Sequence, residues 1–335
     1  MRATLLIAAL PLMVASAAIA QPRVEVPIQQ SVLANGAPRY WVELSIADGA
    51  PIRAMLDTGS TGLRVLAADP SAKALPAAGP EQNYGYTSGA RFSGPPVKAA
   101  IALGAARTPD DFVFQRIDKA ACADERPDCP VSEVAADKYR ICGRGENGFV
   151  AILGTNMGDA DAANPLKAIA RSWIIELPKA GSDQPGRLIL NPTPDETTGF
   201  TALPLDPALA NLRGGFHDAV PGCVIKAGGE TSLCGPMLLD SGAPVVEVAL
   251  GGEARPVAWP GGTKARLTMG RPGAAVAMPF VTDQDQASRV TIRAGKGRPR
   301  NRISAGSLPF QAFAVLYDPQ ARILGLKPRT PTETP

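Results

Sequence analysis

Alternating apolar and polar positions along most of the chain predict β-strands. In residues 40–46 the side chains of Val42, Leu44 and Ile46 fall on one face, which is the two-residue period of a half-buried strand. A turn containing Gly and Pro follows, and the apolar run at residues 52–56 then predicts the second strand of a hairpin. The chain therefore opens as antiparallel β-structure.

Similar patterns continue to the end of the chain, whereas helical periodicity is scarce. With 34 Gly and 33 Pro among 335 residues, the composition favours turns and short strands over long helices. Residues 162–171 form the best helical segment. We therefore predict an all-β fold with few short helices. Further strands are expected at residues 61–66, 97–103, 149–154, 173–177, 187–190, 201–205, 245–250, 313–317 and 322–326, with a hairpin that joins Cys223 to Cys234.

Two short stretches far apart in the chain share one pattern. Residues 55–60 read Met-Leu-Asp-Thr-Gly-Ser and residues 237–243 read Met-Leu-Leu-Asp-Ser-Gly-Ala. Each has an apolar lead-in, an Asp, a hydroxyl residue, and a Gly that permits a sharp turn and close approach of other backbone. One such stretch is weak, because Asp-Thr-Gly is common in turns. Two predict a duplicated unit that brings Asp57 and Asp240 together.

Two carboxyl groups at one site imply acid–base chemistry. They cannot both ionise at low cost, so one holds a proton while the other does not. The pair then supplies a general acid and a general base to a water molecule between them. Gly59 and Gly242 would let the two loops pack closely.

On these motifs the chain, from about residue 40 to residue 328, resembles the pepsin-like aspartic protease family. The resemblance implies a bilobal double β-barrel with a cleft between the lobes, and Asp57 and Asp240 as the catalytic pair. It implies that Thr58 and Ser241 brace the two loops across the junction. Residues 152–154 and 308–328 resemble the family's apolar-apolar-Gly element and its C-terminal hairpin.

The implied activity is that of an aspartic endopeptidase, which hydrolyses extended or unfolded polypeptides through water activation between two aspartates. The expected partner is a peptide or protein substrate, with no nucleic acid, no metal and no cofactor. One chain carries both motifs, so we expect a monomer. The alternative is a catalytically weak pepsin-like module that binds peptides in the bacterial cell envelope.

Several positions depart from the family pattern. The family has Trp where this chain has Arg64, which either points into the cleft to select acidic side chains or packs through its aliphatic stem. The tyrosine of the substrate-covering flap is Tyr84 or Tyr86, and the Tyr-Gly order favours Tyr84. In the second half, residues 304–306 form a less apolar version of the apolar-apolar-Gly element.

The two loops also differ from each other. Ser60 is placed to donate a hydrogen bond to Asp57 and so to favour its ionised form, whereas Ala243 at the equivalent position offers Asp240 no hydroxyl. We therefore expect Asp57 to be the more ionised partner and Asp240 to hold the proton. Activity should extend to less acidic pH than in relatives that have a hydroxyl at that position.

The N-terminus resembles an export signal. Arg2 precedes an apolar run that ends in Ala-Ile-Ala at residues 18–20, a small-x-small cleavage pattern. We predict a signal peptide at 1–20, cleaved after Ala20, although an uncleaved anchor is the alternative. The mature protein would be periplasmic or secreted by a bacterium. We further predict an N-terminal lobe at 21–192, a C-terminal lobe at 193–328 and a disordered tail at 329–335.

Five cysteines agree with an oxidising compartment. Cys223 and Cys234 are expected to pair, and one pair with one free thiol is expected among Cys122, Cys129 and Cys142, in an arrangement that the spacing does not decide. A zinc site would need His217, the single histidine, and no C-x-x-C is present, so His217 reads as a loop residue.

The net charge of +3 indicates neither nucleic-acid nor membrane binding. Residues 293–302 nevertheless hold five cations. They form either a solvated hairpin tip or a cationic rim that attracts acidic peptides or anionic envelope material.

Overall fold

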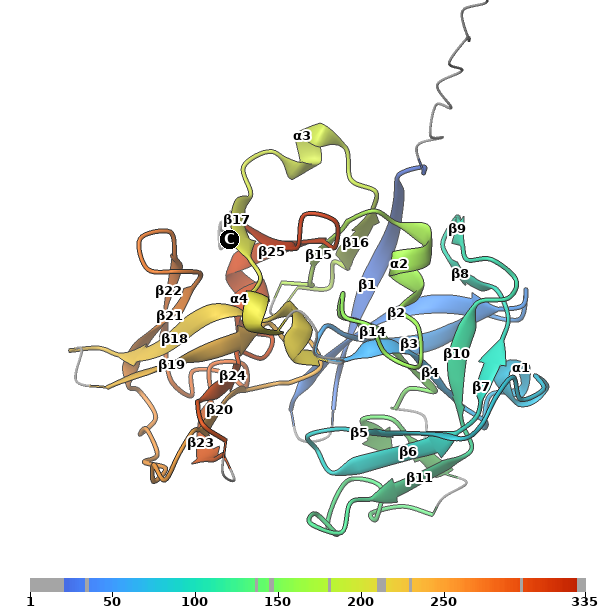
Figure 1. Ribbon diagram of the computed structural model, residues 1–335, viewed down its shortest axis with the longest axis horizontal. Helices are drawn as coiled ribbons and strands as arrows, with labels where there is room; N and C mark the ends of the chain where they lie inside the picture. Colours follow the sequence, from blue (N-terminus) through green and yellow to red (C-terminus); the bar gives the residue numbers. More distant parts are fainter. Residues whose placement is uncertain are drawn as a thin grey trace, which may run out of the picture.

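A computed structural model describes residues 21–33, 36–135, 138–144, 148–179, 182–209, 215–228, 231–295 and 298–329. Strands dominate it and the helices are short, as Figure 1 shows. The predicted signal peptide at 1–20 and residues 330–335 of the predicted tail lie outside the described residues. Arg329 is held in place, because its backbone N–H donates to the Ala312 carbonyl and its guanidinium to the Phe310 carbonyl.

The largest sheet has 14 strands and runs through the middle and one side of the molecule. Its central path follows the order β17 (Thr201–Pro204), β26 (Ile323–Pro328), β25 (Phe313–Asp318), β15 (Trp173–Glu176), β16 (Gly186–Leu190), β1 (Val24–Val32), β2 (Pro38–Ile46), β3 (Ile52–Asp57), β14 (Ala151–Thr155), β4 (Thr61–Leu66), β10 (Val113–Ile117) and β7 (Pro96–Lys98). The last two strands branch from this path, with β8 (Ile101–Leu103) on β2 and β9 (Ala106–Arg107) on β8.

A second sheet of seven strands forms the other side of the molecule (Figure 1). Its order is β22 (Val276–Val281), β21 (Lys264–Met269), β18 (Val220–Lys226), β19 (Ser232–Leu238), β24 (Arg302–Ser304), β20 (Val246–Leu250) and β23 (Val290–Ala294). The smaller sheets consist of β11 (Lys119–Cys122), β6 (Ala90–Gly94) and β5 (Gln82–Gly85), and of β12 (Tyr139–Arg140) with β13 (Gly143–Arg144). The helices are α1 (Pro70–Lys73), α2 (Pro165–Ile169), α3 (Pro194–Thr197) and α4 (Leu308–Ala312), with 3₁₀ turns η3 (Pro207–Leu209) and η4 (Gly215–Asp218).

The two large sheets contain the same three-strand arrangement. In the first, β14 lies between β3 and β4, parallel to β3 and antiparallel to β4. In the second, β24 lies between β19 and β20, parallel to β19 and antiparallel to β20. The two Asp motifs follow β3 and β19, so they occupy equivalent positions in the two units. This is the internal duplication that the sequence motifs predict.

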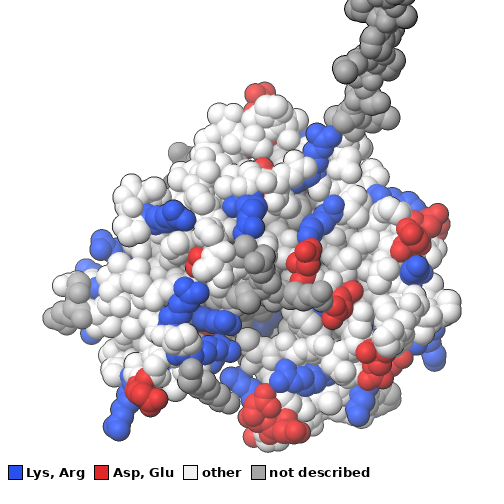
Figure 2. All heavy atoms as spheres, in the orientation of Figure 1, with Lys and Arg blue, Asp and Glu red and all other residues white. Residues whose placement is uncertain are grey.

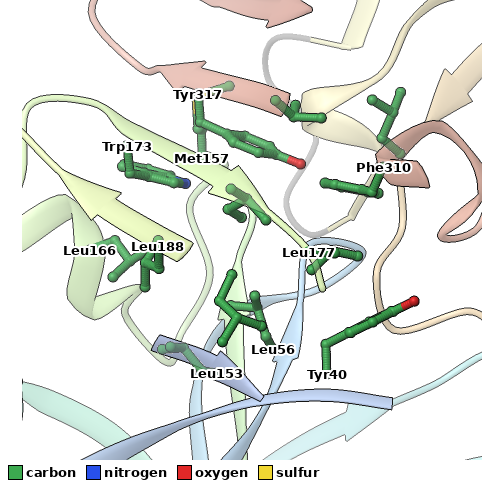
Figure 3. Packing of buried hydrophobic residues seen from close by; sticks show 14 of the residues in the cluster. Tyr40, Leu56, Leu153, Met157, Leu166, Trp173, Leu177, Leu188, Phe310 and Tyr317 are labelled. Atoms are coloured by element: carbon green, nitrogen blue, oxygen red, sulfur yellow. The ribbon is translucent and has the colours of Figure 1, made fainter. Parts of the chain in front are cut away.

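Strands from both sides of residue 192 meet near one end of the largest sheet. The C-terminal hairpin β25–β26 lies between β15 and β17, and β15 continues through β16 to β1. Beneath this region the rings of Trp173 and Tyr317 stack at 5.9 Å between centroids, and Figure 3 shows them beside Leu188 and Met157. This apolar layer continues to Leu56, which precedes Asp57. The two predicted lobes are therefore joined by one sheet and one core.

Most of the predicted strands are present, including the hairpin β18–β19, in which Cys223 lies opposite Cys234. The single strand predicted at 97–103 is wrong: it is divided into β7 and β8, which pair with β10 and β2 respectively. The buried residues Ala99 and Ala100 lie at the break. The helix predicted at 162–171 is confined to α2, which begins at a proline and has Asn164 as its N-cap.

Two disulfides cross-link the chain. Cys223 and Cys234 are bonded as predicted, and Cys122 pairs with Cys129. Cys142 is a free thiol, and burial raises its pKa. No helix among the described residues has the length and apolar character to cross a membrane.

Backbone packs closely beside the first Asp motif at Gly154, which lies opposite Asp57 and Gly62. A Cβ there would be 2.8 Å from the carbonyl oxygens of Gly62 and Ser60. Backbone cannot give way as a flexible side chain can, so Gly154→Ala should lower the free energy of unfolding by about 3 kcal/mol or more.

Urea denaturation of the two proteins tests this prediction. Gly79→Ala is the control, because its Cβ would meet the side chain of Pro96 at 3.0 Å and no backbone. Equal stability of Gly154→Ala and the unmodified protein would contradict the packing described here.

Candidate active site

Asp57 ends β3 and is held from within its own loop. The backbone N–H of Gly59 donates to Oδ1 at 2.9 Å, and the Ser60 hydroxyl donates to Oδ2 at 2.6 Å. The side chain lies beneath the surface, with Asp57 5% exposed. Because both donors favour the charged form, this loop is built to hold a carboxylate.

Asp240 follows β19 in the equivalent loop of the second unit and is less deeply buried. The backbone N–H groups of Gly242 and Ala243 donate to its Oδ1 at 3.0 and 3.1 Å. Ala243 therefore contributes no side-chain donor, as expected. However, the hydroxyl of Ser304 on β24 lies 3.2 Å from Oδ2. A hydroxyl thus reaches Asp240 from a neighbouring strand, which the sequence analysis missed.

Thr58 and Ser241 cross-link the two loops reciprocally. The Thr58 N–H donates to Ser241 Oγ at 3.1 Å, and the Ser241 N–H donates to Thr58 Oγ1 at 2.9 Å. Each hydroxyl then donates across the junction, from Thr58 to the Leu239 carbonyl and from Ser241 to the Leu56 carbonyl, both at 2.7 Å. All of these groups are buried, so the four bonds fix one loop against the other.

The cross-link brings the two carboxyl groups into the same small space. A Cβ on Gly59 would overlap the carboxyl group of Asp240. A Cβ on Gly242 would overlap Oδ1 of Asp57 and would lie 3.2 Å from Oδ1 of Asp240. Both glycines are therefore needed for the approach, and the two Asp side chains are direct neighbours.

The environment gives the two carboxyls different proton affinities. Burial raises the pKa of Asp57 above its usual value, and the Ser60 hydroxyl, the Gly59 N–H and the hydrogen bond with Asp240 oppose part of this rise. Burial and the neighbouring charge of Asp57 raise the pKa of Asp240 to about 7, against the opposing effect of Ser304. These surroundings favour the proton on Asp240 and the charge on Asp57.

Arg64 lies beneath the first loop, and its charged end is enclosed. The residue is 2% exposed, and its guanidinium stacks on the Tyr84 ring with 3.5 Å from Cζ to the ring centroid. It also donates to Gln115 Oε1 at 3.0 Å and to the Thr61 carbonyl at 2.7 Å. Arg64 therefore supports Tyr84 through a cation–π contact, and its charge lowers the pKa of Asp57.

The hairpin β5–β6 carries both of the tyrosines considered for the flap. Tyr84 lies within β5 opposite Phe92, and Tyr86 follows at the turn, with its ring 5.0 Å from that of Tyr84. The charge of Asp57 raises the pKa of each tyrosine further, after the larger effect of burial, so both lie within electrostatic range of the Asp pair. Beside Tyr84 is a small cavity of about 180 Å³, lined by Arg64, Gln82, Asn83, Tyr84, Gln115, Ala160 and Asp161.

His217 and Asp218 form a second polar contact near the junction. Asp218 is buried, accepts the Met157 N–H at 2.8 Å through Oδ2, and contacts His217 Nδ1 at 3.0 Å through Oδ1. This pair fastens η4 to the segment that follows β14. His217 thus has a structural partner, which its loop position in the sequence did not indicate.

The described residues contain no group of three or more His, Cys, Asp or Glu that could hold a metal ion. The cluster at the junction has two carboxyls surrounded by hydroxyl and N–H donors. Such a set can hold a water molecule and exchange protons with it.

The chain was compared with family models, curated proteins and solved structures. No family model matches it, and no curated protein matches it. Among solved structures it is similar to the aspartic proteinase from Irpex lacteus, with a TM-score of 0.58 and 13% sequence identity over 93% of this chain and 99% of that one. The chain therefore has the bilobal pepsin-like fold that the motifs predicted, mostly β with few short helices.

The structure brings together all the residues predicted from the two motifs: Asp57, Thr58, Gly59, Ser60, Asp240, Ser241, Gly242 and Ala243. Ser304 was overlooked as a partner of Asp240. The sequence did contain an indication of this role, because Ser304 occupies the first position of residues 304–306, where the family has an apolar side chain.

Removing one hydroxyl of the cross-link should destabilise the fold. Thr58→Val leaves the Ser241 N–H without its acceptor and the Leu239 carbonyl without its donor, at similar side-chain volume. Two buried groups without partners should lower the free energy of unfolding by about 3 kcal/mol.

Urea denaturation measures this loss. Thr291→Val, at an exposed position of β23, is the matched control and should change stability by less than about 0.5 kcal/mol. The cross-link would be unimportant if both variants unfolded at the same urea concentration.

Proposed function

We propose that this protein is an aspartic endopeptidase that hydrolyses extended or unfolded polypeptides. The observation that supports this most strongly is the pair Asp57 and Asp240, which are direct neighbours with unequal proton affinities. A pair in this state already contains one base and one acid, which is what addition of water to an amide requires.

In the proposed reaction a water molecule lies between the carboxyls. Ionised Asp57 takes a proton from this water as its oxygen bonds to the peptide carbonyl carbon, and protonated Asp240 donates to the carbonyl oxygen. The product of this step is a neutral tetrahedral diol. Proton return to the nitrogen then lets the C–N bond break and releases the amine and the new carboxyl group.

The hairpin β5–β6 is the proposed flap, with Tyr84 or Tyr86 above the substrate. An extended peptide beside a β-hairpin can be held by main-chain hydrogen bonds, while pockets receive alternate side chains. Arg64 would fix the position of Tyr84 through their stacked contact. The lobes at 21–192 and 193–328, and a monomeric state, are part of the same proposal.

We further propose that the protein is exported, with its signal peptide cleaved after Ala20, and acts in the periplasm or outside the cell. The disulfides Cys122–Cys129 and Cys223–Cys234 support an oxidising compartment.

Replacing either carboxyl should abolish hydrolysis. Asp57→Asn removes the base and Asp240→Asn removes the acid, so each should reduce peptide cleavage by the chain beginning at Gln21 at least about a thousandfold. Cleavage of a peptide library, followed by mass spectrometry with and without a statine-type inhibitor, measures this loss. Asp183→Asn in an exposed loop is the control and should keep full activity.

A protein that binds library peptides but cuts none between about pH 3 and pH 7 would instead be the envelope binding module considered above.

The pH profile of cleavage should respond to the hydroxyls around Asp240. Ser304 favours ionised Asp240 and lowers its pKa. Ser304→Ala removes that effect, so Asp240 keeps its proton to higher pH and the alkaline limb of kcat/KM should move upward. Ala243→Ser adds a donor and should move the limb downward.

Profiles of kcat/KM against pH test both directions, with Ser182→Ala in the loop between β15 and β16 as the unchanged control. Identical alkaline limbs in all four proteins would contradict the assignment of the proton to Asp240.

A further inference from the structure

Strand β24 places Arg302 on the same face as Ser304. Side chains alternate along a strand, and Ile303 between them is 0% exposed, packed into the core on the opposite face. Ser304 contacts Asp240 Oδ2 at 3.2 Å. Arg302 therefore lies one side-chain position further along the surface that contains the Asp pair.

The guanidinium of Arg302 is held in place without a carboxylate. It lies over the Phe216 ring of η4, with 5.1 Å from Cζ to the ring centroid, and the residue is half-buried. Within the described part of the chain no Asp or Glu forms an ion pair with Arg302, Arg300 or Arg298.

The other arginines of this region behave differently. Arg293 contacts Glu247 at 2.6 Å, and Arg289 contacts Asp283 at 3.3 Å. The arginines on and just before β23 are thus neutralised, whereas Arg298, Arg300 and Arg302, on and just before β24, are not. This contrast argues against a uniformly solvated charged tip.

Arg298, Arg300 and Arg302 also affect one another electrostatically. Burial, with the charges of Arg298 and Arg300, lowers the pKa of Arg302, which indicates a positive local potential. Figure 2 shows Lys and Arg side chains gathered left of centre, over the region where β24 lies in Figure 1. A cation that is partly desolvated and surrounded by like charges gains most from an incoming anion.

We propose that Arg302, supported by Arg300 and Arg298, forms a substrate subsite that selects peptides with an Asp or Glu side chain near the bond to be cleaved. The proposal rests on the endopeptidase function above and names the substrate class of that site. The guanidinium lies over the Phe216 ring, which restrains its position, and its planar donors can bind a carboxylate through two parallel N–H···O bonds. A peptide is the fitting source of this carboxylate, because Arg302 lies on the same face of β24 as Ser304, whose hydroxyl contacts Asp240.

Arg64 does not serve this purpose, although it was considered for it in the sequence analysis. Its guanidinium is enclosed by Tyr84, Gln115 and the Thr61 carbonyl, so its hydrogen bonds are directed within the protein.

The test compares peptides that differ only in Glu against Gln, scanned through the positions on both sides of the cleaved bond. Near pH 6, where Glu is ionised, kcat/KM at the best position should be about tenfold higher for the Glu peptide. The ratio should fall to about one near pH 3, where Glu is protonated, and also in Arg302→Gln near pH 6. Because both peptides are cut by the same Asp pair, the ratio removes the pH dependence of catalysis itself.

Arg266→Gln is the matched control. This exposed arginine lies on β21 opposite Ile225, toward the far end of the β18–β19 hairpin, and it has no ion pair among the described residues. The Arg266→Gln variant removes one positive charge from the same half of the chain as Arg302→Gln does, so it should retain the tenfold ratio of kcat/KM. Loss of the ratio in Arg266→Gln as much as in Arg302→Gln would overturn the subsite in favour of a general charge effect.

The outcomes separate this inference from the proposed function. Cleavage of Glu and Gln peptides at equal rates at every position would overturn the acidic subsite and leave the endopeptidase intact. If neither peptide is cut, the endopeptidase proposal fails, and the ratio is then measured from the dissociation constants of the same peptides. A binding ratio of one would overturn the subsite, and a tenfold ratio lost in Arg302→Gln would support it.

Discussion

The hydroxyl groups of Thr58 and Ser241 each form hydrogen bonds with the backbone of the opposite loop, and the site depends on this reciprocal cross-link. Their four hydrogen bonds, between 2.7 and 3.1 Å long, can form together only when the loops after β3 and β19 meet in one register. Because the hydroxyls are buried, no water can replace a missing partner at low cost. The shared core beneath the two loops, around Trp173 and Tyr317, holds β3 and β19 at the distance that these four hydrogen bonds require.

Bringing the loops together places two carboxyls side by side, and the electrostatic asymmetry follows. Asp57 accepts a short hydrogen bond from the Ser60 hydroxyl, and the positive charge of Arg64 lowers its pKa. Asp240 accepts a longer hydrogen bond from Ser304, and the negative charge of Asp57 raises its pKa. These differences favour the proton on Asp240. The same strand that brings Ser304 to the pair also carries Arg302, so the donor that tunes the acid and the cation proposed to select the substrate come from one element.

Local pattern was sufficient to predict the two Asp motifs, the Cys223–Cys234 hairpin and the C-terminal hairpin, because each depends on neighbours in sequence. The features that were missed depend on partners distant in the chain. Ser304 lies 64 residues from Asp240, and Arg64 lies under a tyrosine of another sheet. Similarly, residues 97–103 read as one strand, but their two ends pair with β10 and β2. The periodicity of a segment does not tell which other strand pairs with it.

The most direct test of the central claim is a ¹³C NMR titration of the carboxyl carbons of Asp57 and Asp240 in the intact protein. Two carboxyls that share a site should titrate as a pair in two well-separated steps, with Asp240 responsible for the higher one, and Asp57→Asn should remove the separation. Two independent steps, both close to the ordinary Asp pKa of about 4, would contradict the account.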